Sequence, residues 1–267
     1  MENNRIFELK DVTYDYMEKV HAIESLNLKI NQGETIAILG ANGSGKSTLL
    51  KLLDGLYFPN KGEFRAFGSL MNEETLRSKK VARDFHRKVG LVFQDPDVQL
   101  FLPTVWDEVA FAPLQLGLSR KEVSEVASEA LNKLGLYHLK DRAPYHLSEG
   151  EKKKVSIASV LTLDPEVWLM DEPTASLDPR TQGWVIDFIL ELSEKGKTTV
   201  VATHDLEIPH TATNLCYVIG QDHKILAKGA THEILDQEDI LIQANLIHKH
   251  RHIHADVKHA HAHRHWH

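Results

Sequence analysis

The chain has few cysteines, no surplus of basic residues and no long apolar run. Its single cysteine, Cys216, can form no internal disulfide and lies in an apolar run, which predicts a buried thiol in a reducing, cytosolic setting. With 31 basic against 38 acidic residues, the net charge of −7 argues against nucleic acid as the main partner. No apolar run approaches the ~20 residues that cross a bilayer, and residues 1–5 begin no apolar signal core. If the protein drives membrane transport, other subunits must therefore provide the membrane path.

A glycine-rich segment lies between a predicted buried strand at 35–39 and a predicted helix that includes 49–53. It has the pattern G-x4-G-K-S/T and consists of Gly40, Ala41, Asn42, Gly43, Ser44, Gly45, Lys46, Ser47 and Thr48. Such a turn points successive backbone N–H groups at one anion, and the helix dipole adds to the attraction. Lys46 would reach the β and γ phosphates of a nucleotide, and the Ser47 hydroxyl would hold Mg²⁺. The segment therefore predicts a nucleotide-hydrolysing enzyme.

A second motif consists of four apolar residues, 167–170, followed by Asp171 and Glu172. A buried strand that ends in an acid places the carboxylate at the sheet's carboxyl edge, beside the phosphate loop. Asp171 suits the Mg²⁺ shell, and Glu172 would act as a general base or position the attacking water. The alternative is an acidic strand end at the surface, but the combination with Lys46 favours a nucleotide site.

Taken in order, the motifs resemble those of the nucleotide-binding subunits of ABC transporters over about residues 5–235. Leu147 to Glu151 match the family's signature at three of five positions, and residues 176–178 match its D-loop. The resemblance implies ATP and Mg²⁺ as cofactors and a head-to-tail dimer, in which the signature of one subunit closes over the ATP of the other. The implied catalytic residues are Glu172, His204 (the switch histidine) and Gln94 (the Q-loop glutamine). The implied Mg²⁺ ligands are Ser47, Gln94 and Asp171, and further nucleotide contacts come from Tyr16 (with Tyr14 as the alternative adenine-stacking ring), Ser148, Gly150 and Asp178.

Strand and helix patterns predict an α/β fold with a mostly parallel sheet covered by helices. The resemblance implies that this is a P-loop NTPase core with a small antiparallel β part and an inserted helical subdomain. Lys46 and Asp171 are 125 positions apart (171 minus 46), which leaves room for that helical subdomain at about 96–160. We expect residues 1–235 to form the ABC-type ATP-binding domain. A short helical segment at 236–247 and a histidine-rich tail at 248–267 would follow.

The signature departs from the usual family pattern, because Glu149 stands where glycine is common and Glu151 where glutamine is common. Ser148 and Glu151 also form a capping box, which predicts that a helix begins here. Two carboxylates beside a polyanion predict slower hydrolysis, or looser ATP-driven dimerisation, than with glycine at 149, unless they point away or meet the neighbouring lysines. The alternative interpretation is a plain capped surface helix with a solvated lysine run at 152–154.

A narrower resemblance covers residues 93–113, which are similar to the ATPases of energy-coupling-factor importers, especially the cobalt and nickel group. The resemblance implies two membrane partners, a transmembrane coupling subunit and a substrate-capture subunit. The segment would form the groove for a coupling helix, with apolar contacts from Leu100, Phe101, Val105 and Trp106. The alternative is that these side chains pack inside the helical insertion.

Nine of the last twenty residues are histidine: His248, His250, His252, His254, His259, His261, His263, His265 and His267. In an extended chain alternate residues share one face, and imidazole favours nickel, copper, zinc and cobalt. We interpret the tail as a native metal-binding segment, disordered without metal, although an engineered end remains the alternative. The tail could serve transport, or it could only buffer metal.

The sequence therefore predicts the ATPase of a nickel or cobalt importer, bound at the cytoplasmic face of the cell membrane as a dimer with a second ATPase subunit. An alternative is the same ATPase powering uptake of another small substrate, such as a vitamin. A soluble ABC ATPase without a membrane partner would need a second cassette, a coiled coil or a basic face, and the sequence shows none. A metal-storage protein would explain the tail but not the ATP motifs.

Overall fold

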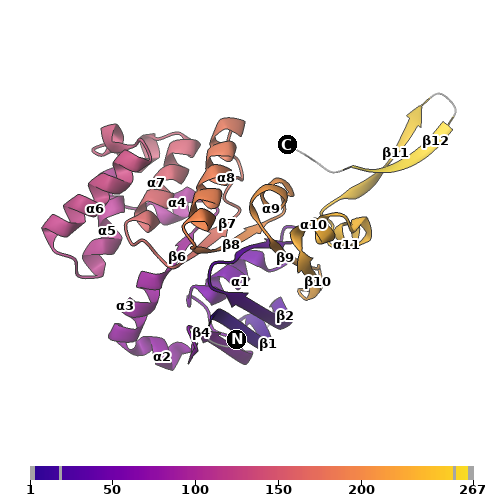
Figure 1. The fold of residues 1–267 in the computed structure, drawn as a ribbon, viewed down its shortest axis with the longest axis horizontal. Coiled ribbons are helices and arrows are strands. Elements are labelled where there is room, and N and C mark those ends of the chain that lie inside the picture. Colours follow the sequence, from indigo (N-terminus) through magenta and orange to yellow (C-terminus); the bar gives the residue numbers. More distant parts are fainter. Residues whose placement is uncertain (1–3, 18–19, 255–256, 264–267) are drawn as a thin grey trace. The chain divides into compact units, whose positions relative to one another are not determined.

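The computed structural model describes residues 4–17, 20–254 and 257–263. The chain divides into two compact units, one made of residues 1–73 and 200–267 and the other of residues 74–199 (Figure 1). Strand β8 (Thr198–Thr203) runs across the division. Within the described residues, no helix is both long and apolar enough to cross a membrane.

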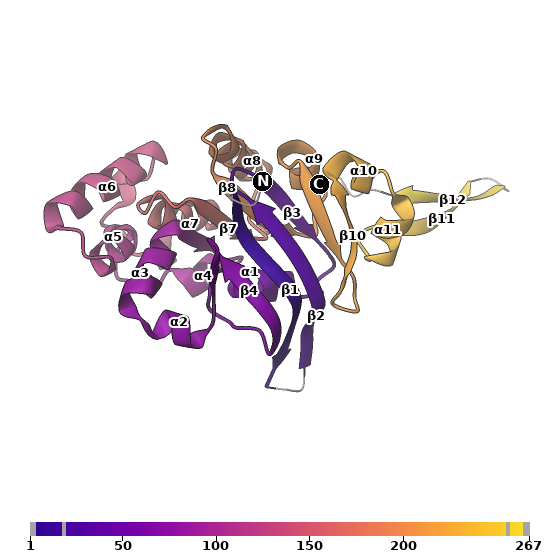
Figure 2. The same cartoon turned by 60° about the horizontal axis from the view of Figure 1, so that its bottom comes forward.

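The first unit contains an antiparallel sheet with the strand order β2-β1-β4-β5. Its strands are β1 (Arg5–Tyr16), β2 (Val20–Asn31), β4 (Lys61–Ala66) and β5 (Ser69–Leu70). Along β2 the buried residues alternate as Leu26, Leu28 and Ile30, the period expected when one face of a strand meets the core. Strands β1 and β2 have twelve residues each and lie side by side (Figure 2). The predicted antiparallel β part is confirmed.

The same unit holds the phosphate-loop strand β3 (Thr35–Leu39), which pairs in parallel with β9 (Leu215–Ile219). Strand β10 (Ile225–Ala230) pairs antiparallel with β9. The helices of the unit are α1 (Lys46–Leu53), α9 (Glu207–Ala212), α10 (Thr231–Leu235) and α11 (Glu238–Gln243). Cys216 is fully buried among Ala37, Leu39 and Val218, and burial raises the pKa of its thiol to about 12, so the predicted core thiol is confirmed.

The second unit has two parallel strands, β6 (Val89–Val92) and β7 (Val167–Asp171), and most of the helices. The helices are α2 (Glu73–Arg77), α3 (Lys79–Lys88), α4 (Pro96–Gln99), α5 (Val105–Gln115), α6 (Arg120–Lys133), α7 (Glu149–Leu161) and α8 (Pro179–Glu194), with 3₁₀ turns at Tyr137–Leu139 and Pro144–His146. Helices α4 to α7 fill the predicted helical stretch, whereas α2 and α3 precede it and were not predicted. Helices α5, α6 and α7 pack together, and each has buried apolar residues, such as Val109, Ala127 and Val155.

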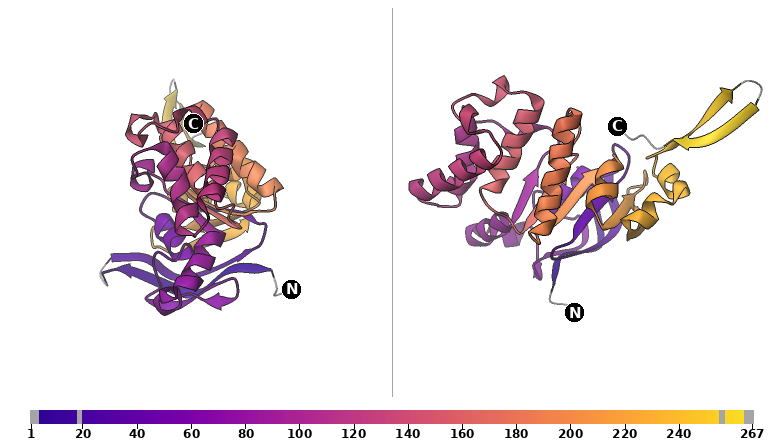
Figure 3. Two further views of the ribbon diagram at one scale, coloured as in Figure 1. Left: turned by 90° about the vertical axis from the view of Figure 1, so that its left-hand side faces the viewer. Right: turned by 45° about the horizontal axis from the view of Figure 1, so that its top comes forward.

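The histidine-rich tail forms an antiparallel hairpin of β11 (His248–His254) and β12 (Val257–His263), drawn in yellow in Figure 3. Its register sets His248 opposite His263, His250 opposite His261 and His252 opposite His259. Two antiparallel runs of equal length can satisfy each other's backbone groups in this way. His265 and His267 lie outside the described residues.

Candidate functional site

The phosphate loop between β3 and α1 has a backbone shape that depends on glycine. Gly45 has φ 106°, and a Cβ added there would lie 2.1 Å from the carbonyl oxygen of Ala22. Lys46 is buried, and its Nζ donates hydrogen bonds to the carbonyl oxygens of Gly40 (2.8 Å) and Ala41 (3.2 Å). The lysine therefore holds the loop closed around its own ammonium group.

The loop also has the properties of a phosphate site. Within the described residues, no side chain caps the N-terminus of α1, whereas α6 and α7 each begin with a capping box. A helix N-terminus without a side-chain cap favours an anion. The Ser44 hydroxyl is buried and has no hydrogen-bond partner within the described chain. These donors suit the phosphates of a nucleotide, and the half-buried Ser47 follows Lys46 at the place where a hydroxyl can meet Mg²⁺.

Three tyrosines cluster beside the phosphate-loop helix. The Tyr16 hydroxyl lies 2.8 Å from the Thr48 Oγ1 on α1. Tyr14 stacks on Tyr57, with 5.1 Å between ring centroids and 12° between planes, and Tyr16 meets both rings edge-on. One face of Tyr14 is therefore covered by Tyr57, which favours Tyr16 as the adenine-stacking ring. Tyr57 was not predicted, because nothing in the local sequence indicates that it packs on β1.

In the second unit, β7 ends at the predicted acidic pair. Asp171 and Glu172 are buried, with 6% and 4% of their surfaces exposed. Glu172 has φ 40°, in the left-handed region that residues other than glycine seldom occupy. Backbone strain of this kind concentrates at functional sites, because the surrounding structure must hold it in place.

Asp178 caps the N-terminus of α8. Its carboxylate accepts hydrogen bonds from the backbone N–H groups of Arg180 (3.0 Å) and Thr181 (3.1 Å) and from the Thr181 hydroxyl (2.6 Å). These bonds, led by that of the Thr181 side chain, lower the pKa of Asp178. Asp178, which matches the D-loop aspartate, therefore stabilises the start of a helix within its own subunit.

The Q-loop (residues 93–97) follows β6, and Gln94 within it is exposed. Lys153 of α7 is fully buried and donates hydrogen bonds to the carbonyl oxygens of Phe93 (3.0 Å) and Gln94 (2.7 Å). Burial lowers the pKa of Lys153 to about 8, although the charges of Asp171, Asp95 and Glu149 oppose that shift.

The interpretation of residues 152–154 as a solvated lysine run is wrong for two of the three. Lys152 and Lys153 are both buried, and the Lys152 Nζ lies 2.9 Å from a carboxylate oxygen of Asp97 and 3.1 Å from one of Glu149. Lys154 is half-buried, with its Nζ 4.8 Å from the centroid of the Trp184 ring on α8.

The predicted capping box at the start of α7 is confirmed. The Ser148 backbone N–H and hydroxyl both donate to Glu151 at 2.8 Å, and these bonds lower the pKa of Glu151. Glu149 meets Lys152, which offsets part of the charge expected to slow hydrolysis. Gly150 packs so closely on α8 that an added Cβ would lie 2.9 Å from the Thr181 Oγ1.

The predicted site residues are divided between the two units. The phosphate loop, Tyr16 and the exposed His204, which follows β8, belong to the first unit. Gln94, Ser148, Gly150, Asp171, Glu172 and Asp178 belong to the second. No cluster of three or more potential metal-ligating His, Cys, Asp or Glu side chains occurs in the part of the chain that the structure describes.

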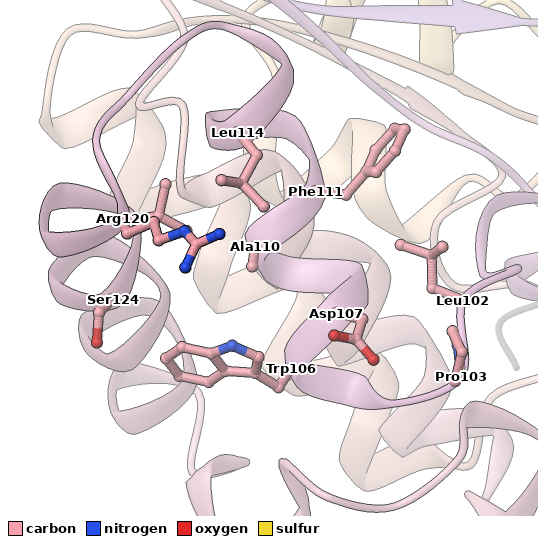
Figure 4. Close-up of a pocket in the computed structure, with 10 residues that line it drawn as sticks. Leu102, Pro103, Trp106, Asp107, Ala110, Phe111, Leu114, Arg120 and Ser124 are labelled. Atoms are coloured by element: carbon pink, nitrogen blue, oxygen red, sulfur yellow. The ribbon is translucent and has the colours of Figure 1, made fainter.

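A cleft of about 630 Å³ lies on the helical part of the second unit (Figure 4). Trp106, Phe111 and Leu114 of α5 line it, together with Arg120 and Ser124 of α6. Of the four residues predicted to contact a coupling helix, Leu100 and Val105 are buried in the core. Phe101 is 67% exposed and touches Phe111 edge-on, and Trp106 lines the cleft, so only these two are placed to meet a partner.

Comparison with known proteins agrees with this geometry. The ABC transporter family description matches residues 23–175. The energy-coupling factor transporter ATP-binding protein EcfA of Methanothermobacter thermautotrophicus is 41% identical over 241 residues, which cover 90% of this chain and 76% of the relative. Among solved structures, CbiO1 of Clostridium perfringens, described as part of the ABC transporter complex CbiONQ, is 33% identical with a TM-score of 0.75, covering 91% of this chain and 95% of that one.

A second solved structure is an ATP-binding cassette in a dimeric, post-hydrolysis state bound to ADP and Pi. It is 29% identical with a TM-score of 0.75, and the match covers 85% of this chain and 99% of that one. Together with the family match, these likenesses settle the class of protein: the chain belongs to the ABC transporter family and is an ATPase of its ATP-binding type.

Proposed function

We propose that the chain is the ATPase subunit of an energy-coupling-factor importer and works as a dimer of two such subunits. The observation that carries the proposal is the phosphate loop with its uncapped helix and buried lysine, together with an apolar cleft on the helical part of the second unit. The likenesses to EcfA, to CbiO1 and to a dimeric cassette support it. The subunit would lie at the cytoplasmic face of the membrane, held there by its partners.

In the proposed cycle Lys46 binds the β and γ phosphates of ATP, and Tyr16 stacks on the adenine. Ser47, Gln94 and Asp171 would hold Mg²⁺, which when bound neutralises charge on the phosphates. Ser148 and Gly150 of the other subunit close over the γ-phosphate. Glu172 accepts a proton from the attacking water or positions that water, with His204 beside the phosphate.

The cleft between α5 and α6 would receive an apolar helix of the transmembrane coupling subunit. Its lining offers aromatic and aliphatic anchors, namely Trp106, Phe111 and Leu114, with Asp107 and Arg120 as polar groups. An apolar groove with a few charged groups is the usual form of a helix-in-groove contact. A soluble ABC ATPase without a membrane partner would not need such a contact.

We expect Leu114→Asp to reduce co-purification with small membrane proteins at least about tenfold, because it places a charge in the lining of the cleft. The measurement is affinity purification from detergent-solubilised cells, followed by mass spectrometry. Leu70→Asp is the control, since Leu70 on β5 has similar exposure (42% against 48%) but lies outside the cleft. Absence of membrane proteins from the wild-type preparation would favour a soluble ABC ATPase instead.

The proposed cargo is nickel or cobalt. The support is the histidine-rich tail, in which the register sets three pairs of histidines opposite each other across the hairpin, and imidazole is a preferred ligand of both metals. The alternative is that the transporter carries another small substrate, such as a vitamin, while the tail only buffers metal.

Deletion of residues 248–267 separates these two possibilities. If the tail takes part in transport, uptake of nickel or cobalt by cells should fall, and a tail of equal length with asparagine in place of each histidine should behave like the deletion. If the tail only buffers metal, uptake is unchanged while the metal bound per purified chain is lost. In either case metal affinity should fall below about pH 6, because only neutral imidazole binds metal.

A further inference from the structure

Residues 93–99, which include the Q-loop, are fastened to helix α7 by three polar ties within the second unit. Lys153 donates to the carbonyl oxygens of Phe93 and Gln94. The Gln99 amide accepts from the Phe93 N–H (3.1 Å) and donates to the Ser156 carbonyl oxygen (2.9 Å). Lys152 binds the Asp97 carboxylate. The segment therefore lies against the same helix that begins with the signature residues Ser148 and Gly150.

Of these ties, the one from Lys153 reaches the backbone of Gln94 itself. Its side chain has no exposed surface, so its charge is stabilised by the two carbonyl oxygens and nearby acids rather than by water. A carbonyl bound by an ammonium group is held more firmly than one bound by a neutral donor. The Gln94 side chain, by contrast, is left exposed at the end of β6.

We propose that Lys153 is a positioning residue of the ATPase, whose ammonium group holds the Gln94 backbone on the signature helix so that Gln94 and the signature segment move as one piece. The inference rests on the proposed role of Gln94 at Mg²⁺. Lys153 would touch neither nucleotide nor metal and would act only through the backbone of the Q-loop.

The test compares Lys153→Met with Lys154→Met in the full-length protein. Lys154 is the matched control because it lies on the same helix but faces the Trp184 ring. For Lys153→Met we expect kcat to fall and the Mg²⁺ concentration at half-maximal rate to rise, each by about 10- to 100-fold. ATP affinity measured without Mg²⁺ should stay within about twofold, because the phosphate loop is untouched. Amide hydrogen exchange of residues 93–97 should become faster even without nucleotide.

A merely structural role would lower the thermal midpoint without moving the Mg²⁺ dependence, and that result, or values equal to those of Lys154→Met, overturns the inference. If Lys153→Met does not fold, Lys153→Arg and Lys153→Gln replace it. Lys153→Arg keeps a cation, so its kcat should be higher than that of Lys153→Gln when the two variants have equal thermal midpoints. Equal kcat values for these two variants overturn the inference. Gln94→Ala separates failure of the proposed role of Gln94 from failure of the inferred role of Lys153. A normal rate in Gln94→Ala refutes the role of Gln94. A slow Gln94→Ala together with a normal Lys153→Met refutes the role of Lys153.

Discussion

Glu172→Gln is expected to abolish steady-state ATP hydrolysis and to leave the protein as an ATP-bound dimer. Glu172 is 4% exposed, directly follows Asp171 at the end of β7 and has a strained backbone at φ 40°. Glutamine preserves the shape of the side chain but cannot accept a proton. The loss of a general base costs about 10²- to 10⁴-fold in rate, whereas nucleotide binding by the phosphate loop should be unaffected.

The measurements are phosphate release and the molecular mass in solution with Mg-ATP. Wild-type protein should pass through the dimer, while the variant should accumulate in it. Glu166→Gln is the control, because Glu166 precedes the same strand, is partly exposed and pairs with Lys88 at 3.4 Å. A monomer that hydrolyses ATP at full speed, or a variant that keeps the wild-type rate, would refute the proposed dimeric site.

Gly45→Ala is expected to have the second largest effect. The added Cβ would lie 2.1 Å from the Ala22 carbonyl oxygen, and that oxygen belongs to the backbone of β2 and cannot turn aside. The loop must therefore shift, and a displacement of about 1 Å at the phosphates should reduce kcat/KM by about 100-fold. Affinity for ATP should fall with it.

Gly43→Ala provides the control within the same loop. Gly43 also has a positive φ (82°), but no atom of the described residues lies within 4 Å of the position of an added Cβ. This variant should therefore lose only about 1–2 kcal/mol of unfolding free energy, from the left-handed backbone. Nucleotide titration and thermal melts of the two variants test the difference. Equal ATP affinity in both would show that the contact with Ala22 does not shape the site.

Local patterns were enough to predict the phosphate loop, the buried strand β3, the capping box at Ser148 and the class of fold. Each of these depends on neighbours in sequence. A glycine-rich turn, an apolar run or a Ser-x-x-Glu pattern determines the local structure within a few residues. The ordered series of motifs then identified the family, although none of them would have done so alone.

Features that depend on distant residues could not be predicted. Three lysines in a row are typical of a solvated surface, and only the position of the Q-loop beside α7 explains why Lys153 is buried. The stacking of Tyr57 on Tyr14 likewise requires β1 to lie beside the end of α1. In the predicted coupling groove, Leu100 and Val105 are as apolar as Phe101, and sequence alone does not tell which side chains face the core.

The carboxylate of Asp178 has a consequence for mutagenesis of the loop that precedes α8. Asp178→Ala would remove three hydrogen bonds from the first turn of α8. The helix end would therefore fray even if Asp178 had no role between subunits. Asparagine can still accept the two amide bonds and thus keeps the turn wound. Only the comparison of the two substitutions separates an effect of Asp178 on the proposed dimer from simple loss of a helix end.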